Sequence, residues 1–148
     1  MHRYFKTTAA LVLAVAGLAI SVTADARDDR LKFPIADAVT AAGDRLDGSV
    51  KFYWGTQAYP KTGGNLGTDT SNKKTNFVGK DDKTACEWAW LSAMLAFQAK
   101  AKQLGANAVV NLHSVYKNQD FTSETEYECG AGSIMGGVAL RGTFVKLP

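Results

Sequence analysis

TACEWAWLSAMLAFQAKAKQLGANAVVNLHSVY, residues 84–116, joins a helical pattern directly to a strand pattern. Thr84 and Glu87 have the spacing of a capping box, in which each side chain covers the other residue's backbone amide, so a helix is expected over 85–104. Gly105 follows at the position where a left-handed residue commonly ends a helix. This stretch therefore predicts a long helix that returns at once into a strand, a unit typical of an α+β domain.

Apolar residues follow two stripes of the expected helix. One stripe recurs every three or four positions and is predicted to face the core: Cys86, Trp90, Ala93, Phe97, Ala101 and Leu104. A second stripe, offset from the first, holds Trp88, Leu91 and Leu95. A helix with two apolar faces is either covered by its own chain, here the N-terminal segment, or contacts another subunit. Both interpretations are open, and the second makes the protein a homo-oligomer.

The strand after this helix is expected over 108–116, a run rich in β-branched residues. Simple alternation divides its side chains between two faces, with Val110, Leu112 and Tyr116 on one and Asn111 and His113 on the other. Further elements are expected as a short helix over 34–42 and strands over 49–54, 125–129 and 133–146. The fold class expected is α+β, with one long helix packed on a small antiparallel sheet.

Three segments carry no strong periodic pattern. Residues 27–32 are charged and are expected to fray, with Asp28 and Asp29 solvating this tail. The stretch 55–80 is expected to be a long polar loop, with a hairpin through 73–78 as the alternative. The glycines of 130–132 are expected to form a bend or bulge.

Cys86 and Cys129 are the two cysteines of the chain. In the strand that ends at Cys129, alternation sends Glu126 and Glu128 to solvent and Tyr127 and Cys129 to the interior. Both thiols then face the same core, and an even cysteine count in an exported protein indicates a disulfide. Closing a loop of this length stabilises a fold by roughly 4 kcal/mol in the chain-entropy model. One disulfide between these cysteines is therefore expected.

Residues 1–26 have the order of a secretory signal peptide. Basic residues precede an apolar run of about 12 residues, which is too short to span a bilayer of roughly 30 Å as a helix. Ala24 and Ala26 form the small-residue pattern that a signal peptidase recognises. Cleavage after Ala26 is expected to leave 27–148 as a single α+β domain in the bacterial periplasm, without a stable membrane anchor.

Composition and motifs argue against several classes of function. A net charge of +3 over 148 residues is far below what a dedicated nucleic-acid binder needs. Gly79-Lys80 is followed by Asp81, so the phosphate-binding GxxxxGK[ST] loop is absent, and the pair Asp81-Asp82 is expected to cap a helix. His113, the one histidine after the leader, leaves neither a recognisable catalytic triad nor an intrachain zinc site. No catalytic residue, enzyme activity or cofactor is expected.

His113 and its neighbour Asn111 are the candidate ligand contacts. The ordinary role of such a histidine is that of a polar residue on a sheet face. A ring of His113 side chains from several subunits is the arrangement that would bind a metal, because zinc sites need three or four ligands. A metal is therefore expected at an oligomer interface or not at all.

Three segments resemble those of known bacterial proteins: ACEWAW at 85–90, KQLGANAVVN at 102–111 and YECGAG at 127–132. They look like small exported proteins labelled "excinuclease ATPase subunit", a label that the missing nucleotide loop contradicts. More distantly, the helix, the ANAVV strand and the returning glycine-rich strand resemble the YbjQ-like domain, called a heavy-metal-binding domain, which forms oligomers. They also resemble the signalling domain of the Rcs envelope-stress lipoprotein, in which disulfides pin the sheet. These resemblances imply the fold and no catalytic residue.

Two functions follow as expectations. The first is an exported, non-enzymatic binding or interaction module that contacts an envelope protein in envelope stress or maintenance. The alternative is an oligomer that binds a metal or a small ligand through His113. Nucleic acid is not expected as a partner in either case, and neither is a DNA-repair ATPase activity.

Overall fold

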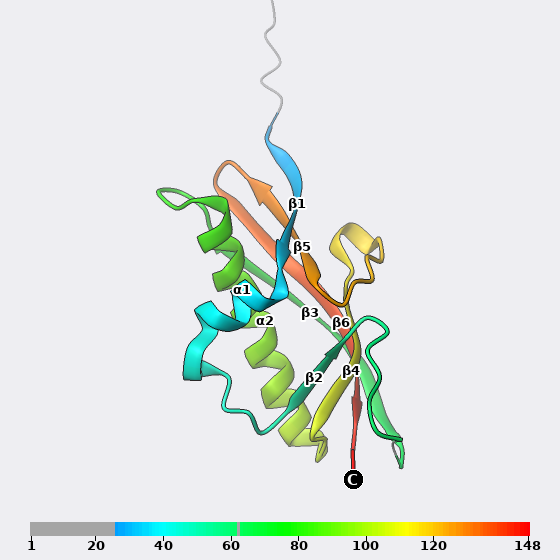
Figure 1. The fold of residues 1–148 in the computed structure, drawn as a ribbon. Helices are drawn as coiled ribbons and strands as arrows, with labels where there is room; N and C mark the ends of the chain where they lie inside the picture. The colour runs from blue at the N-terminus through cyan, green and yellow to red at the C-terminus, as the bar shows by residue number, and fades with distance from the viewer. Residues whose placement is uncertain (1–25, 62) are drawn as a thin grey trace, which may run out of the picture.

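The computed structural model describes residues 26–61 and 63–148. They form an α+β fold of two α-helices and a six-stranded sheet (Figure 1). The elements are β1 (Asp28–Pro34), α1 (Ile35–Ala42), β2 (Lys51–Trp54), β3 (Asn65–Asn76), α2 (Asp82–Leu104), β4 (Ala108–Ser114), β5 (Glu126–Gly132) and β6 (Met135–Val145), with 3-10 turns at Gly43–Arg45 and Tyr116–Asn118. The predicted signal peptide lies, except for Ala26, outside the described residues. No described helix is long and apolar enough to cross a membrane.

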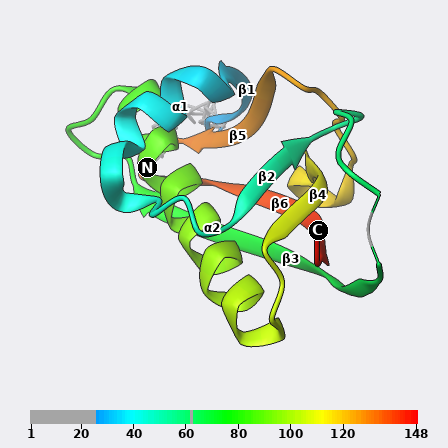
Figure 2. The ribbon, with the colours of Figure 1, turned by 60° about the horizontal axis from the view of Figure 1, so that its bottom comes forward.

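Strand β6 is the centre of the sheet. One of its edges pairs with β3 along almost its whole length, and its other edge pairs with β5 near the start and with β4 near the end. The sheet is mixed, because β2 runs parallel to β4 while the other pairs are antiparallel. The expectation of a purely antiparallel sheet is therefore wrong: β3 and α2 lie between β2 and β4 in the chain and provide the long crossover that parallel pairing needs. Figure 2 shows the sheet curling around α2, with α1 beside this helix.

Helix α2 begins three residues earlier than the capping box predicts. Its N-cap is Asp81, whose carboxylate accepts hydrogen bonds from the Thr84 backbone amide (2.9 Å) and hydroxyl (2.7 Å). These bonds stabilise the charged carboxylate and lower the pKa of Asp81. The predicted end is confirmed, since Gly105 has the left-handed φ of 72°. The expectation that the Asp81-Asp82 pair caps a helix is confirmed as well.

The predicted core stripe of α2 is buried, apart from Leu104 at its end. Trp90 lies at its centre, stacked on Trp54 from β2 with ring centroids 6.2 Å apart. Tyr127 from β5 packs against Trp90 at 6.1 Å. Trp54 and Val50 are both buried in this core. The core therefore joins α2 to strands from both ends of the sheet.

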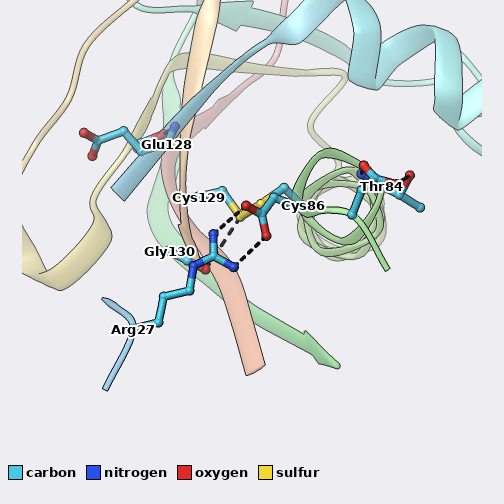
Figure 3. The surroundings of a disulfide bond; sticks show 9 residues. Arg27, Thr84, Cys86, Glu128, Cys129 and Gly130 are labelled. Carbon is cyan, nitrogen blue, oxygen red and sulfur yellow. Dashed lines mark hydrogen bonds and ion pairs between the residues drawn. A yellow bond between two sulfur atoms is a disulfide. The ribbon is translucent and has the colours of Figure 1, made fainter. Parts of the chain in front are cut away.

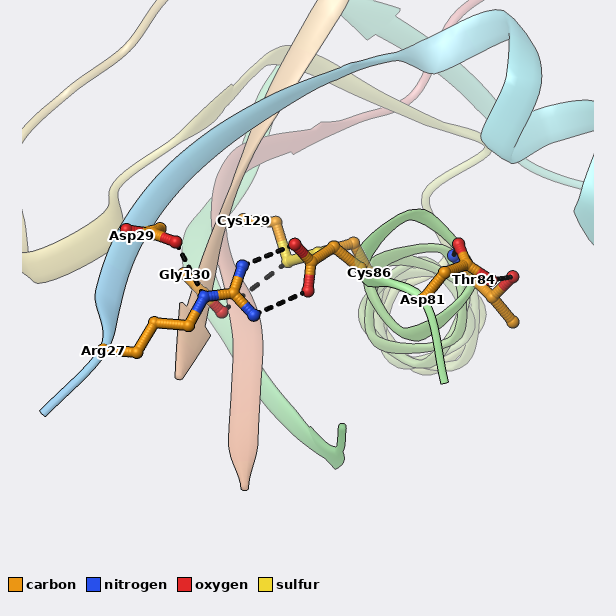
Figure 4. Close-up of polar contacts among 8 residues, drawn as sticks. Arg27, Asp29, Asp81, Thr84, Cys86, Cys129 and Gly130 are labelled. Carbon is orange, nitrogen blue, oxygen red and sulfur yellow. Dashed lines mark hydrogen bonds and ion pairs between the residues drawn. A yellow bond between two sulfur atoms is a disulfide. The ribbon is translucent and has the colours of Figure 1, made fainter. Parts of the chain in front are cut away.

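The predicted disulfide is present (Figure 3). Cys86 on α2 and Cys129 on β5 have Cα atoms 6.0 Å apart, and both residues are fully buried. Beside this bond, the Arg27 guanidinium donates to both carboxylate oxygens of Asp82 (3.0 and 2.5 Å) and to Asp29 (2.7 Å) (Figure 4). The start of β1 is thus tied to the first turn of α2. The expectation of a frayed, solvated tail over 27–32 is wrong, because β1 pairs with β5 through seven registered positions.

Strand β3 lies inside the stretch that was expected to be a polar loop, and no hairpin forms at 73–78. Its residues alternate in side, but both faces are polar, so the sequence has no apolar period. Strand β3 forms because it pairs with β6, whose residues facing α2 are apolar and which lies at least 59 positions further along the chain. The formation of β3 therefore depends on a strand that is distant in the sequence.

Strand β4 departs from simple alternation at Asn111, whose φ of 51° is left-handed. The register of β4 against β6 shifts between Val110 and His113. As a result Val109 and Leu112 belong to the core under α2, while Val110 packs in a small second cluster with Ala108. The prediction that Val110, Leu112 and Tyr116 share one face of a strand over 108–116 is wrong, because the bulge turns Leu112 to the core and β4 ends at Ser114, before Tyr116.

The glycines of 130–132 continue strand β5 and form no bend or bulge within it, contrary to expectation. A Cβ added at Gly130 would lie 2.0 Å from the Tyr116 ring, so glycine is needed there for close approach of that ring. The chain reverses after Gly132 and enters β6 at Met135.

The second apolar stripe of α2 is covered only in part. Leu91 is buried, and α1 packs against α2. Trp88 remains 50% exposed with the Arg45 guanidinium 5.0 Å above its ring, and Leu95 is at the margin of exposure. The N-terminal segment therefore provides part of the cover that the sequence requires, and an oligomer contact through Trp88, Leu91 and Leu95 stays a prediction.

Candidate functional site

The face of the sheet that points away from α2 is called the outer face below. It carries polar side chains of β3 and β6. On it, the hydroxyls of Thr68 and Thr143 lie 2.9 Å apart across β3 and β6. One step along, the Arg141 guanidinium donates to the Thr70 hydroxyl (3.2 Å). The outer face is therefore a surface of hydrogen-bonding groups held on two long, paired strands, which is a rigid base for a site.

The segment that follows β4 folds over this face. Ser114 pairs with Phe121 as an isolated bridge, which closes a loop between them. Lys117 and Asn118 take left-handed conformations (φ 52° and 58°) in that loop. These two residues accommodate the tight reversal at some backbone cost. The loop therefore places Tyr116, Lys117 and Asn118 next to β6.

A groove of about 620 Å³ runs between this loop and β3. Gly136 and Gly137 at the start of β6 form part of its lining. Three cationic side chains line it: Lys74, Lys117 and Arg141. Its other lining residues are neutral, with none acidic: Thr70, Asn72, Val115, Tyr116, Asn118, Met135, Gly136, Gly137 and Ala139. The groove thus combines positive charge with amide and hydroxyl groups that can orient a ligand.

Two of these cations lie close to acidic residues that do not line the groove. Lys117 forms an ion pair with Asp28, which lowers the pKa of that carboxyl and raises the pKa of Lys117. Asp120 lies 3.7 Å from Arg141. Lys74 is exposed, and no ion pair to it is found within the described residues. Exposed pairs of this kind bind weakly, so an incoming anion can exchange for them.

His113 and Asn111, the candidate ligand contacts, lie near the groove but do not line it. His113 stands opposite Arg141 in the sheet, with Nδ1 2.7 Å from the Asn111 carbonyl and Nε2 3.7 Å from Asp120. Asn111 itself forms the bulge of β4 and is exposed. Within the described residues, no three His, Cys, Asp or Glu side chains gather closely enough to hold a metal ion. The structure therefore gives Asn111 a backbone role in the bulge of β4. It places His113 opposite Arg141 in the sheet but outside the lining of the groove.

Apart from Lys74, which the sequence offers with Lys73 as an anion contact or as part of a solvated loop, the groove residues could not be identified from the sequence, for two reasons. Thr70, Asn72 and Lys74 fall in the segment that was expected to be a loop. Arg141 and Lys117 are far apart in sequence, and a lone basic residue in a strand or turn carries no motif. Two lysines and one arginine, spread from position 74 to position 141, become a site only when β3, β6 and the loop after β4 meet.

Glu128 contradicts the expectation that it faces solvent, since it is 3% exposed. It does point to the outer face, away from Cys129 (Figure 3), where the Arg30 guanidinium lies beside it. Its amide donates to the Ser114 hydroxyl (2.9 Å), and Oε1 lies 3.9 Å from the Arg30 guanidinium. Oε2 has no hydrogen-bond partner among the described residues. Arg30 is further held over the Tyr116 ring at 5.6 Å.

The Arg30→Ala variant is expected to lose about 2 kcal/mol of unfolding free energy, because it leaves the buried Glu128 carboxylate without its counter-charge. Urea denaturation of Arg30→Ala, Glu128→Gln and the double variant measures this. Glu128→Gln alone is expected to be nearly neutral, and the double variant should recover most of the loss. If Arg30→Ala and the double variant are equally unstable, the lost contact is with Tyr116 instead.

A second cavity, of about 480 Å³, lies between α1, β2 and α2. It is mainly apolar, and Trp54 and Trp90, the stacked pair of the core, form part of its wall. Its one charged lining residue, Glu124, already accepts a hydrogen bond from Thr56 (2.6 Å). This cavity is an incompletely covered part of the core, while the outer-face groove presents charged groups to solvent, so the groove is the candidate site.

Comparisons of the chain with models of protein families, with curated proteins and with solved structures find no match. The candidate site is therefore interpreted from its own geometry and charge.

Proposed function

We propose that the protein is a non-enzymatic binding module of the bacterial periplasm, whose outer-face groove binds an acidic segment of an envelope protein. The observation that carries this proposal is the charge of the groove, which has three cations and no acid in its lining. Lys and Arg side chains on a rigid sheet recognise carboxylates by charge-assisted hydrogen bonds. Asn72 and Asn118 add donors and acceptors for a peptide backbone.

The shape of the groove fits an extended segment better than a compact ion. The lining follows β3 from Thr70 to Lys74 and returns along β6 to Arg141, so the cations are spread over several residues of strand. Gly136 and Gly137 in the lining present backbone groups and no side chain to a ligand. The periplasmic location is supported by the Cys86–Cys129 disulfide, since such bonds persist in oxidising compartments.

A metal- or ligand-binding oligomer built on His113 is the second candidate. His113 keeps Nε2 directed toward Asp120, which leaves that nitrogen close to the surface. Asp120 is the one metal-type ligand found beside it, and no group of three such ligands forms within the described residues, so this candidate needs the other subunits to complete the site. It stays a prediction, and metal uptake by the purified protein and by His113→Ala tests it.

Titration with a short glutamate-rich peptide tests the proposed function. Amide NMR signals of Lys74, Lys117 and Arg141 are expected to shift on addition of the peptide, and the affinity should fall as salt is added. Arg141→Gln is expected to weaken binding about tenfold, since it removes one charge-assisted contact of roughly 1.4 kcal/mol. Lys83→Gln makes the same charge change at the start of α2, away from the groove, and should leave the affinity unchanged.

Two results contradict the proposal. Equal losses in Arg141→Gln and Lys83→Gln would show that the peptide responds to net charge alone. Shifts confined to other parts of the sheet would place binding elsewhere on the protein. A lysine-rich peptide of the same length is the control ligand, and it is expected not to bind.

A further inference from the structure

Strand β3 forms a long unpaired edge of the sheet. It pairs with β6 on one side, and no other described strand pairs with it. Its 12 residues are about twice the length of an average strand. Proteins usually shield such edges with proline, bulges, short strands or charged side chains, and of these β3 has the charges of Asp69, Lys73 and Lys74. The one irregularity of β3 lies at its start, between Asn65 and Gly67, and the pairing is regular from Gly67 to Asn76.

The register identifies which backbone groups face the free edge. The Ala139 carbonyl of β6 accepts from the Val115 amide on the side away from β3. In an antiparallel pair, alternate residues direct both N–H and C=O to the same side. Asn72, which stands opposite Ala139, therefore directs its N–H and C=O away from β6. The same alternation leaves the backbone groups of Thr68, Thr70 and Lys74 on the free edge.

A hollow accompanies this edge on the side of α2. It has a volume of about 370 Å³ and is lined by β3 residues around Ser71 and by Ala96 and Lys100 of α2. Ser71 is 8% exposed, and its hydroxyl has no hydrogen-bond partner among the described residues. A buried hydroxyl without a partner is costly and rare in native proteins. The centre of the free edge thus has both space and an unsatisfied polar group.

We propose that β3 pairs with β3 of a second copy of this chain, antiparallel, with the two-fold axis at Ser71. In this register Thr70 exchanges backbone hydrogen bonds with the partner's Asn72, and Asp69 stands opposite the partner's Lys73. The two copies of Ser71 are directly opposite each other, so a rotation about χ1 lets one hydroxyl donate to the other. The two sheets then form one continuous sheet, with the same surface used on both copies.

Charge selects this register over its neighbours. Asp69 and Lys73 are on the same face of β3, and neither forms an ion pair within the described residues. With the axis at Ser71, both pairs between Asp69 and the partner's Lys73 are attractive. Moving the axis one residue in either direction places Asp69 and Lys73 opposite uncharged residues. Moving it by two residues places Asp69 opposite Asp69, or Lys73 opposite Lys73.

One contact in the single chain must change on pairing. The Thr70 amide is bound by the Asp69 carboxylate of the same strand (2.8 Å). Both residues are exposed, so this local bond is weak. The partner's Asn72 carbonyl replaces Asp69 as acceptor, and the partner's Lys73 takes the freed carboxylate. The exchange leaves no donor unsatisfied. This interface goes beyond the proposed groove function and does not depend on it.

Cysteine substitution tests the position of the axis. In an antiparallel pair, directly opposed residues that do not exchange hydrogen bonds have Cα atoms about 4.5 Å apart, within the range of a disulfide. Ser71→Cys is therefore expected to give a covalent dimer under mild oxidation, seen on a non-reducing gel. Thr70→Cys, which lies opposite Asn72 in this register, should remain a monomer on the gel. Absence of a dimer with Ser71→Cys, or a dimer with Thr70→Cys instead, overturns the proposal.

Charge reversal tests the pairing without new cysteines. Sedimentation equilibrium of the wild-type protein is expected to show a monomer–dimer equilibrium. Lys73→Glu should weaken the dimer at least about tenfold, because two attractive pairs become repulsive. Asp69→Lys combined with Lys73→Glu restores opposite charges and should restore the dimer. A wild-type protein that stays monomeric at high concentration, or a double variant no better than Lys73→Glu, contradicts the interface.

Discussion

Removal of the Cys86–Cys129 disulfide is expected to lower the free energy of unfolding by about 4 kcal/mol. The bond closes a sequence separation of 43 residues, which includes most of α2, the whole of β4 and the loop that walls the groove. Without it the unfolded chain gains the conformational freedom of that loop. A domain of this size has a total stability of roughly 5–15 kcal/mol, so the loss is a large fraction of it.

Urea denaturation followed by tryptophan fluorescence measures the effect. The wild-type protein under reducing conditions keeps both side chains, and Cys86→Ala/Cys129→Ala removes both sulfur atoms at buried positions. Similar losses in the two samples show that the covalent link is responsible. A loss below about 1 kcal/mol in the reduced wild-type protein contradicts the loop-closure argument. If the loss is that small, the groove residues are expected to be no more mobile in the reduced protein than in the oxidised protein.

The helix α2 and the disulfide could be predicted because their signals are local. Gly105 ends the helix by its own conformational preference, and the spacing of Cys86, Trp90 and Phe97 shows which side is buried. The start of the helix was misplaced by three residues, because Asp81 and Thr84 are both good caps and the sequence cannot rank them. Periodicity and caps therefore predicted this helix, and two cysteines on inward-facing positions predicted the disulfide that anchors it.

The groove could not be predicted, because each of its walls depends on contacts distant in the sequence. Strand β3 has no apolar period, and its pairing with β6 is what makes Asn72 and Lys74 neighbours of Gly137. The left-handed Asn111 changes which side chains of β4 face the core, and a single asparagine in a strand gives no warning of this. Alternation predicts that Glu128 faces solvent, but its side chain is buried. Alternation shows on which face of the sheet a side chain lies and does not show whether other residues cover that face.

Two tryptophans of α2 differ in how far other elements cover them, so their replacement is expected to cost very different free energies of unfolding. Trp90→Ala is expected to cost about 4 kcal/mol, because it opens a cavity beneath Trp54 and Tyr127 at a position with 0% exposure. Trp88→Ala is expected to cost about 1 kcal/mol or less, since that side chain is half exposed and mainly loses its contact with Arg45.

The pair is a matched comparison. Both changes are Trp to Ala inside the same helix, so the gain in helix propensity is the same and cancels in the difference. Urea denaturation followed by far-UV circular dichroism avoids the altered fluorescence of the variants. Equal losses in Trp88→Ala and Trp90→Ala would mean that Trp88 is buried in solution, as a subunit contact through the Trp88, Leu91 and Leu95 stripe requires. A difference of about 3 kcal/mol would leave β3 as the surface on which a second copy is expected.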